Sequence, residues 1–403
     1  MYKQVWVFLI PRLLLYLIHN IVIYMENKSF LTEQIITYIG NKRKLLSHIS
    51  REVEFILKEI NKNKANICDL FSGSGVVSRV LKQYSNKLYV NDLERYSYVI
   101  NDCYLTNNED FNEDIYEKYL NDVLSFPPVK GVITSNYAPA DDNDIKEDER
   151  VFYTHYNAIR IDTIRTAIDE CVEESYKKFF LAPLLYEASV HTNTSGVFKG
   201  FYKSKSEKKG KFGGDKENAL ERICGEIKLK HPIFSNYNAD IILLNENAND
   251  AVKHIKDLDI TYIDPPYNQH PYGSNYFMLN TILNNKIGNN ISKISGIPDD
   301  WNKSSYNKKS EALKSFEHLI EDLDTKYAII SYNNEGFISE NEMTQMLSKY
   351  GSVIVKEIKY VTFRGCRNLK NRNKSTIEYL FILKKNIDIG KIEYINDEES
   401  LFQ

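Results

Sequence analysis

The fold of this 403-residue chain is decided by the stretch Asn66-Ile67-Cys68-Asp69-Leu70-Phe71-Ser72-Gly73-Ser74-Gly75. Its first half is apolar and favours a strand, its second half is a glycine turn, and the run that follows from Val76 favours a helix. The two glycines allow the backbone to approach a ligand closely, with a helix N-terminus behind it. The stretch therefore predicts a strand–turn–helix unit of an α/β fold, with a ligand site at the turn.

A second strand, Tyr89-Val90-Asn91, ends in the carboxylate of Asp92. In doubly wound folds, an acid at this position holds the ribose hydroxyls of a cofactor. The three-glycine dinucleotide fingerprint is incomplete, which argues against NAD, and the triphosphate-binding pattern is absent. Asp92 is therefore a candidate ribose-binding residue in a protein that does not use NAD.

A third strand, Ile260 to Ile263, ends abruptly in Asp264-Pro265-Pro266-Tyr267. The prolines remove two backbone donors and fix φ near −65°, so the strand stops here and the loop is stiff. Open α/β sheets bind ligands at the carboxyl ends of their strands. A rigid carboxylate, bare carbonyls and an aromatic face at this position suit a flat base that carries an exocyclic amine.

Periodic apolar patterns predict the remaining elements. The polar segment 284–309 is interpreted as a mobile surface segment. We expect a helix over 45–60, a helical region over 160–190, strands at 241–244 and 327–332, helices over 252–255, 275–283 and 311–323, and an antiparallel pair of strands over 348–362 and 376–383.

The long excursion between about residues 105 and 238 predicts an inserted domain. It contains lysines interleaved with Phe198, Phe201 and small polar residues, a pattern that suits a surface following nucleic-acid phosphates. A flexible solvated loop is the alternative. The lysines are Lys199, Lys203, Lys205, Lys208 and Lys209.

Two further basic clusters lie at the ends of predicted elements. Lys42 to Lys44 begin the first helix, where cations are poorly placed against the helix dipole; either an anionic partner or a solvated basic turn explains them. The connection between the last two predicted strands suits a clamp for a nucleic-acid backbone better than a charged hairpin tip, because it has no acid. Its cations are Arg364, Arg367, Lys370, Arg372 and Lys374.

Composition limits the possible classes of protein. The chain is 42% apolar and 27% charged, which is typical of a globular protein. Its net charge of −3 means that any contact with nucleic acid must rely on local patches. The five cysteines are widely spaced and the eight histidines form no His-x-x-x-His pair, so we expect a reducing cytosol and no metal site.

The first 24 residues are strongly apolar but are interrupted by Pro11, Arg12, His19 and Asn20. A helix that spans a membrane needs about 20 apolar residues, and no small-residue cleavage site follows, as a signal peptide would require. We therefore expect the native chain to start at Met25. A membrane anchor is the second interpretation and a packed N-terminal helix the third.

Taken together and in this order, the motifs resemble those of the class I, S-adenosylmethionine-dependent adenine-N6 DNA methyltransferases. The closer resemblance is to the D12 class, which includes the Dam-like enzymes, and it covers residues 35–105 and 240–385. The matching residues are Tyr38, Gly40 and Lys42, then Asp69, Phe71, Gly73 and Gly75, then Asn91 and Asp92, and finally Asp264, Pro265, Pro266 and Tyr267.

The resemblance implies a Rossmann-like mixed α/β sheet that ends in an antiparallel hairpin. Residues 25–105 and 240–403 would form the cofactor-binding catalytic domain, and 106–239 a mostly helical target recognition domain inserted into it. The implied function is the transfer of a methyl group from S-adenosylmethionine to N6 of adenine in duplex DNA. The implied setting is a restriction system whose endonuclease is a separate protein.

The resemblance also implies individual roles. Asp92 would hold the ribose of S-adenosylmethionine and Asp250 would approach its adenine, while Asp264 and Pro265 would accept hydrogen bonds from the target amine and Tyr267 would stack on the base. DNA would contact Lys199, Lys203, Lys205, Lys208, Lys209, Arg364, Arg367 and Arg372. The cofactor pocket would be formed by Tyr38, Gly40, Lys42, Asp69, Phe71, Gly73, Gly75, Asp92, Asp250 and Asp264.

The identity of the residue at position 264, the first of the Asp-Pro-Pro-Tyr motif, distinguishes adenine methyltransferases from related enzymes that act on cytosine or glutamine. Cytosine-N4 methyltransferases usually carry Ser in place of Asp264, and protein-glutamine and many RNA N6 enzymes usually carry Asn. Asp therefore favours adenine in DNA, with an RNA adenine-N6 methyltransferase as the enzymatic alternative. A DNA-binding specificity protein that has lost catalysis is a further alternative, against which the intact motifs argue.

Overall fold

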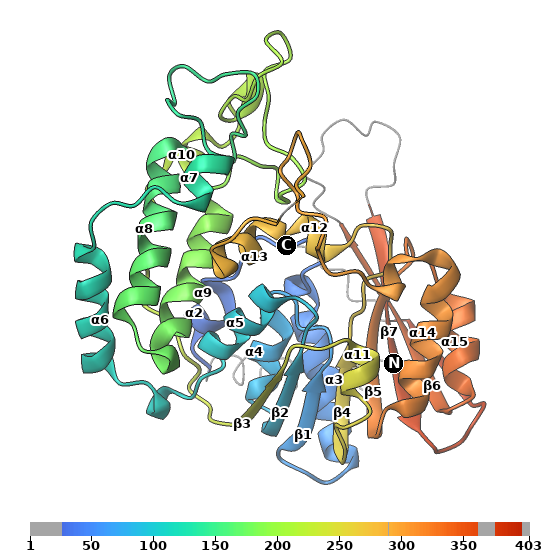
Figure 1. Cartoon of the computed structure of the whole chain (residues 1–403). Helices are drawn as coiled ribbons and strands as arrows, with labels where there is room; N and C mark the ends of the chain where they lie inside the picture. Colours follow the sequence, from blue (N-terminus) through green and yellow to red (C-terminus); the bar gives the residue numbers. More distant parts are fainter. Residues whose placement is uncertain (1–25, 289, 362–374, 397–403) are drawn as a thin grey trace, which may run out of the picture.

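A mixed sheet of eight strands forms the centre of the computed structural model, which describes residues 26–288, 290–361 and 375–396 (Figure 1). The strand order is β3-β2-β1-β4-β5-β7-β6-β8. The first five strands pair in parallel, β7 is antiparallel to both β5 and β6, and β8 pairs in parallel with β6. The strands are β1 Ala65–Asp69, β2 Ser85–Asn91, β3 Asp240–Leu244, β4 Leu258–Ile263, β5 Thr325–Asn333, β6 Gly351–Val361, β7 Ser375–Lys385 and β8 Ile392–Asn396.

Two regions with predictions lie outside the described residues. They are the apolar segment 1–24 and the basic connection with Arg364, Arg367 and Arg372. Elsewhere, the predicted strands at 241–244, 260–263 and 327–332 and the predicted antiparallel pair are confirmed. Strand β8 and helix α15, Glu340–Ser348, were not predicted.

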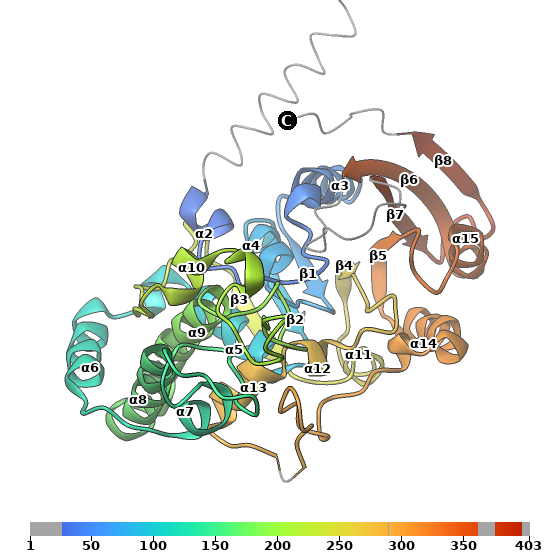
Figure 2. The ribbon, with the colours of Figure 1, turned by 90° about the horizontal axis from the view of Figure 1, so that it is seen from above.

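The central strands are buried on both faces, as is typical of a parallel sheet covered by helices. All six residues of β4 are buried. Successive side chains point to opposite faces, so Ile67 and Ile329 belong to one apolar cluster, whereas Cys68 and Ile330 belong to the other. Seen from above, α3 and α4 cover the first face and α14 and α15 the second (Figure 2).

The helices follow the apolar periodicity of the sequence. The helix predicted over 252–255 is the main difference: the observed α11 lies earlier and ends at Ala251, because Lys253 and His254 then close i→i+3 hydrogen bonds. The remaining helices are α2 Lys28–Thr32, α3 Leu46–Glu59, α4 Val76–Lys82, α5 Arg95–Tyr104, α6 Glu113–Ser125, α7 Val132–Tyr137, α8 His155–Cys171, α9 Glu174–Val190, α10 Leu220–Cys224, α11 Ala248–Ala251, α12 Tyr272–Asn275, α13 Phe277–Asn284 and α14 Lys309–Asp322.

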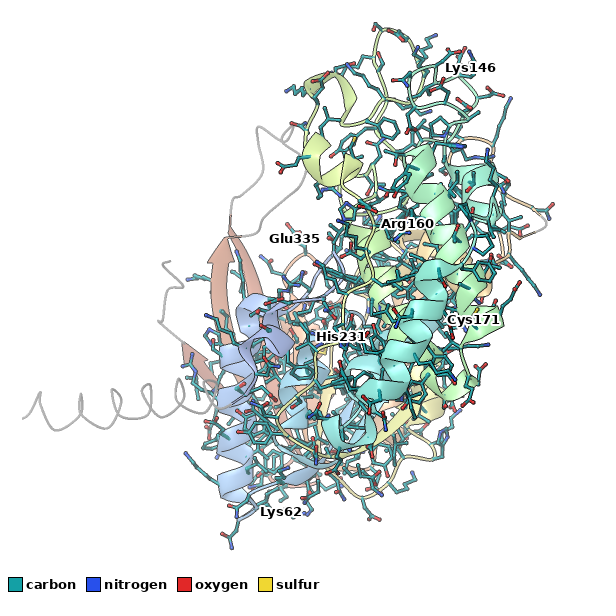
Figure 3. The ribbon with its side chains drawn as sticks, turned by 90° about the vertical axis from the view of Figure 1, so that its left-hand side faces the viewer. Lys62, Lys146, Arg160, Cys171, His231 and Glu335 are labelled. Carbon is teal, nitrogen blue, oxygen red and sulfur yellow. The ribbon has the colours of Figure 1, made fainter. Side chains whose placement is uncertain are left out.

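The segment predicted as an insert, residues 106–239, contributes helices α6 to α10, joined by long irregular stretches, and lies on the side of the first face of the sheet. Helix α9 contacts α5 and α13, and its buried residues belong to the same apolar cluster as those of α4 and α5. Figure 3 shows α6 and α8 on the outer side of this layer. Among the described residues, no helix is both long enough and apolar enough to cross a membrane.

Candidate active site

A cavity lies where the carboxyl ends of β1, β2 and β4 meet the loop after β3. Parallel strands place their carboxyl ends at one edge of the sheet, and this is where α/β folds bind ligands. The cavity brings together residues from all four motifs of the sequence. The predicted site residues that line it are Tyr38, Gly40, Lys42, Asp69, Phe71, Gly73, Asp92, Asp264 and Pro266.

The turn after β1 requires its glycines. Gly73 and Gly75 have φ of +51° and +76°, which side-chain-bearing residues rarely adopt. A Cβ on Gly73 would lie 2.8 Å from Cε1 of Tyr38, and a Cβ on Gly75 would lie 2.6 Å from Oδ1 of Asn101. Gly73 lines the cavity, whereas Gly75 lies outside its lining and caps α4.

Asp92 holds the glycine turn in place. The backbone N–H groups of Gly73 and Glu94 donate to its two carboxylate oxygens at 2.7 and 2.8 Å. Burial raises the pKa of Asp92 to about 6, although these hydrogen bonds oppose the rise. Each oxygen keeps a further lone pair for a ligand in the cavity.

Asp69 presents an unsatisfied acceptor at the base of the cavity. Its side chain is fully buried, and Oδ2 accepts a hydrogen bond of 2.6 Å from the hydroxyl of Ser78. Oδ1 has no hydrogen-bond partner among the described residues. Burial raises the pKa of Asp69 to about 7. A buried acceptor without a partner is costly, so this oxygen suits a ligand that carries a donor or a positive charge.

A buried ion-pair network lies at the end of β4. The ammonium of Lys42 is 3.1 Å from Oδ1 of Asp264 and 2.9 Å from Oε1 of Glu378. Burial raises the pKa of Asp264 to about 7, outweighing the opposing effect of the Lys42 charge. Burial disfavours the charge on Lys42, but the two carboxylates outweigh it and hold the pKa of Lys42 well above its usual value.

The Asp-Pro-Pro-Tyr loop is held in place by contacts with the end of β5 and the residues after it. The carbonyl of Tyr267 accepts a 2.9 Å hydrogen bond from the N–H of Phe337, and its ring packs edge-to-face on Tyr332 at 6.0 Å. Pro266 lines the cavity, whereas Pro265 and Tyr267 lie outside its lining. The carboxylate of Asp264 is therefore fixed at the cavity wall, with an aromatic ring directly after it.

Two tyrosines that the sequence did not single out hold the first motif. The ring of Tyr38 is nearly parallel to those of Tyr272 and Tyr276, with centroids 4.9 and 4.6 Å away. The N–H of Ile39 donates to the hydroxyl of Tyr276 at 2.7 Å, and the hydroxyl of Tyr272 donates to the carbonyl of Ile39 at 3.2 Å. The sequence signal that could have identified them is the group of aromatic residues, Tyr272, Tyr276 and Phe277, that follows the Asp-Pro-Pro-Tyr loop.

The polar segment predicted as a mobile surface segment supplies one wall of the cavity. Two hydrogen bonds attach it to neighbouring loops: Asn302 donates to the carbonyl of Leu93 at 3.1 Å, and Tyr306 donates to Asn249 at 2.9 Å. This position follows from side-chain contacts between distant loops, which have no periodic signal in the sequence. The lining residues that were not predicted include Glu94, Glu246, Asn247, Asn302, Ser304, Tyr306 and Asn307.

The structure places Asp250 away from the cavity. Its carboxylate is 65% exposed and forms an ion pair of 2.7 Å with Lys253 on the next turn. Asn247, the N-cap residue of α11, lines the cavity instead. The residues after β3 that line the cavity are therefore Glu246, Asn247 and Ala248 rather than Asp250.

Four predicted DNA-contacting lysines, Lys203, Lys205, Lys208 and Lys209, lie on an irregular hairpin closed by a bridge between Lys203 and Gly210, and Lys199 precedes it. Lys199, Lys203, Lys205 and Lys208 are exposed. Lys209 is half-buried and lies 2.8 Å from Glu207. In Figure 1 the loops around α10 stand above α12, beyond the carboxyl edge of the sheet.

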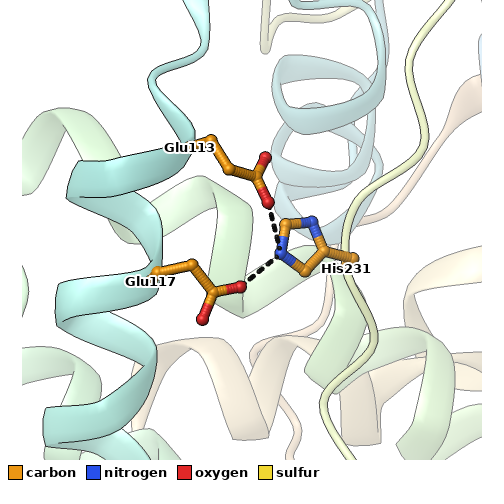
Figure 4. A group of neighbouring side chains, drawn as sticks. All are labelled: Glu113, Glu117 and His231. Carbon is orange, nitrogen blue, oxygen red and sulfur yellow. Dashed lines mark hydrogen bonds and ion pairs between the residues drawn. The ribbon is translucent and has the colours of Figure 1, made fainter.

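One His/Glu group lies on the insert, apart from the residues that line the cavity. Nε2 of His231 is 2.9 Å from Glu117 and 3.1 Å from Glu113, which are one turn apart on α6 (Figure 4). One ring nitrogen facing two carboxylates is hydrogen-bond geometry. All three side chains are exposed, so we interpret the group as a link between α6 and the segment that returns to β3.

The sheet with its one reversed strand, the glycine turn after β1 and the Asp-Pro-Pro-Tyr loop after β4 define a class I methyltransferase fold. The sequence model of the D12 class N6 adenine-specific DNA methyltransferases matches residues 38–346, and the chain belongs to this family.

Named relatives agree with this assignment. The chain is 31% identical to the type II methyltransferase M.NlaIII of Neisseria lactamica, over 86% of this chain and 99% of that one. It is also 31% identical to the type II methyltransferase M.CviAII of Paramecium bursaria Chlorella virus 1, over 86% and 98% of the two chains. The type II methyltransferase M.FokI of Planomicrobium okeanokoites is 29% identical over 87% of this chain but 53% of its own length. The protein is an adenine-specific DNA methyltransferase, and the predicted class and activity are confirmed.

Proposed function

We propose that the protein binds S-adenosylmethionine in the cavity and methylates N6 of an adenine flipped out of duplex DNA. The observation that carries this proposal is the position of Asp264, which shares one cavity with the glycine turn and with the unsatisfied Oδ1 of Asp69. When bound, S-adenosylmethionine supplies an electrophilic methyl group on a positively charged sulfur.

Several features of the cavity fit this cofactor. The free oxygen of Asp69 suits an ammonium group, and the lone pairs left on Asp92 suit ribose hydroxyls. The glycine at position 73 lets the ring of Tyr38 lie directly against the turn that lines the cavity. Asn247 and Ala248, which line the cavity, would contact the cofactor's base in place of Asp250.

Asp264 and Pro265 would act on the amine of the target base. That amine is a weak nucleophile because its lone pair is delocalised into the ring. Accepting both of its hydrogens at a carboxylate and a carbonyl localises the lone pair on nitrogen and stabilises the positive charge that develops there. Alignment of the amine with the methyl group then allows direct transfer, so no covalent enzyme intermediate is required.

The target base must leave the DNA stack to reach Asp264, which costs a few kcal/mol. Stacking on the ring of Tyr267 would return on the order of 1–3 kcal/mol. The edge-to-face contact with Tyr332 fixes that ring from behind. We therefore assign base stacking to Tyr267 and orientation of Tyr267 to Tyr332.

DNA binding is assigned to the insert. Residues 106–239 would form the target recognition domain, and Lys199, Lys203, Lys205, Lys208 and Lys209 would contact phosphates. Arg364, Arg367 and Arg372 are proposed as a second contact on sequence grounds. We further propose a cytoplasmic enzyme that protects DNA from a separate restriction endonuclease, as the type II names of its relatives suggest.

The test is transfer of labelled methyl groups from S-adenosylmethionine to duplex DNA, with an RNA duplex as the matched substrate. We expect labelled N6-methyladenine in DNA, and loss of labelling in Asp264→Ala with cofactor binding retained. Transfer to RNA alone would contradict the DNA assignment. A fully active Asp264→Ala variant would contradict the proposed role of this carboxylate.

A further inference from the structure

Glu378 is a carboxylate without an assigned role. It lies on β7, two strands away from β4 in the sheet, and its side chain is fully buried. It contacts the site through other residues: Oε1 is 2.9 Å from the ammonium of Lys42 and accepts a 2.6 Å hydrogen bond from the hydroxyl of Ser331 on β5.

A buried carboxylate is costly unless it is paired. The single positive charge of Lys42 is enough to compensate the negative charge of Asp264, so this pair does not require a second carboxylate. The structure instead places a second carboxylate on the far side of the same ammonium. The ammonium of Lys42 is therefore shared between two carboxylates, Asp264 and Glu378.

This sharing matters because a positive charge moves during methyl transfer. Methyl transfer breaks the carbon–sulfur bond, whose electron pair stays on sulfur, and forms a carbon–nitrogen bond with the lone pair of N6. The positive charge thus moves from sulfur to N6, and a proton then leaves N6. When Lys42 is shared with Glu378, the carboxylate of Asp264 keeps more of its negative charge for the positive charge that develops at N6 than it would if it were the sole partner of Lys42.

We propose that Glu378 is a positioning residue for methyl transfer: it shares the charge of Lys42 and so leaves the carboxylate of Asp264 available to the target amine. This inference rests on the proposed function of the cavity and goes beyond it. Glu378 lies outside the cavity lining, so it acts through Lys42 and does not touch the substrate.

The decisive variant is Glu378→Gln, which keeps the side-chain shape and removes the charge. We expect kcat to fall by roughly 10- to 100-fold, the range found when a partner that orients a ligating group is removed. KM for DNA and the dissociation constant of S-adenosylmethionine should change little, since neither ligand touches Glu378. Glu378→Asp should restore part of kcat, because it keeps the charge.

A pH profile separates this role from a structural one. The charged groups close to Asp264 are Lys42, Glu378 and Asp69, and the nearby phenols are those of Tyr262, Tyr267 and Tyr272. Removing the Glu378 charge lowers the pKa of Asp264, because that charge raises it. The acidic limb of kcat should therefore move to lower pH in Glu378→Gln.

Three controls make the result interpretable. Glu393→Gln removes another strand glutamate, which lies on β8 in a 2.7 Å ion pair with Lys391, and should leave kcat unchanged. Ser331→Ala removes one donor to Glu378 without changing any charge, and it covers the case in which Glu378→Gln fails to fold; kcat should fall by a smaller factor. Thermal unfolding of each variant gives the folded fraction.

The outcomes are distinct. A wild-type protein without activity on DNA contradicts the proposed function itself. An active wild type with a Glu378→Gln variant of unchanged kcat and pH profile overturns the inference about Glu378. A loss that the unfolded fraction explains in full, with Ser331→Ala unchanged, overturns it as well and makes Glu378 a structural residue.

Discussion

The ammonium of Lys42 and Oδ1 of Asp264 are 3.1 Å apart, although the two residues are separated by more than 200 positions in the chain. Lys42 is 4% exposed and Asp264 18%, so the pair is largely shielded from water. Removing one partner of a buried ion pair leaves an uncompensated buried charge and is strongly destabilising. The pair therefore links the segment before α3 to the Asp-Pro-Pro-Tyr loop.

Lys42→Met should destabilise the protein and abolish transfer. Loss of one partner of a buried pair typically costs about 3–5 kcal/mol. We expect the lower end of this range, because the freed carboxyl of Asp264 can take up a proton. Urea unfolding measures the loss. Lys58→Met, on the exposed side of α3, is the control and should change stability by no more than about 0.5 kcal/mol. Equal stabilities of the two variants would contradict the prediction.

The pH dependence of kcat should report Asp264. Its pKa is raised to about 7 by burial. The amine-accepting form is the carboxylate, so kcat should rise with pH and level off above about pH 7, falling nearly tenfold per pH unit below it. The measurement is a kcat profile at saturating DNA and cofactor. A profile that is flat from about pH 5.5 to 8 would argue against a titrating group here.

The apo protein should become less stable as the pH rises from about 4 to about 7. Burial raises the pKa of Asp69 and of Glu94 to about 7 each. In this window the folded state keeps protons that the unfolded chain has released, so raising the pH favours unfolding. Melting curves of wild type and Asp69→Asn should therefore diverge with pH, with the variant relatively more stable near neutrality. Parallel curves would contradict the raised pKa of Asp69.

Gly73→Ala should lower cofactor affinity. The added Cβ would lie 2.8 Å from the ring of Tyr38, and the φ of +51° is unfavourable for alanine. We expect a loss on the order of tenfold or more in affinity, equivalent to about 1.4 kcal/mol, within the cost of such backbone strain. Isothermal titration with S-adenosylmethionine measures it. Gly200→Ala is the matched control, because its Cβ would meet no atom within 4 Å.

Replacing Lys203, Lys205, Lys208 and Lys209 with alanine should weaken DNA binding and flatten its salt dependence. Each phosphate contact contributes roughly 0.9 to the slope of log K against log salt concentration. DNA binding measured at several salt concentrations gives the slope. Alanine at four lysines on other surfaces, Lys58, Lys118, Lys256 and Lys314, is the control and should leave the slope unchanged. An unchanged slope in the first variant would make that hairpin a solvated loop.

The local elements of the fold could be predicted because their causes are local. Glycine at 73 and 75 permits a positive φ, proline at 265 and 266 fixes φ, and apolar periodicity distinguishes strand from helix. Strand β8 had no such signal: Tyr394 and Ile395 are exposed on this edge strand, so its pattern shows no buried face.

The sequence by itself determined the order of the motifs, the strand ends that carry Asp69, Asp92 and Asp264, and the family to which they belong. Only the tertiary structure decided which groups meet at those ends. Sheet order brings Glu378 on β7 to the same ammonium as Asp264, the residue after β4. The physical reason is that a side chain's backbone constraints act over a few residues, whereas its charge partners are set by strand pairing between segments far apart in the chain.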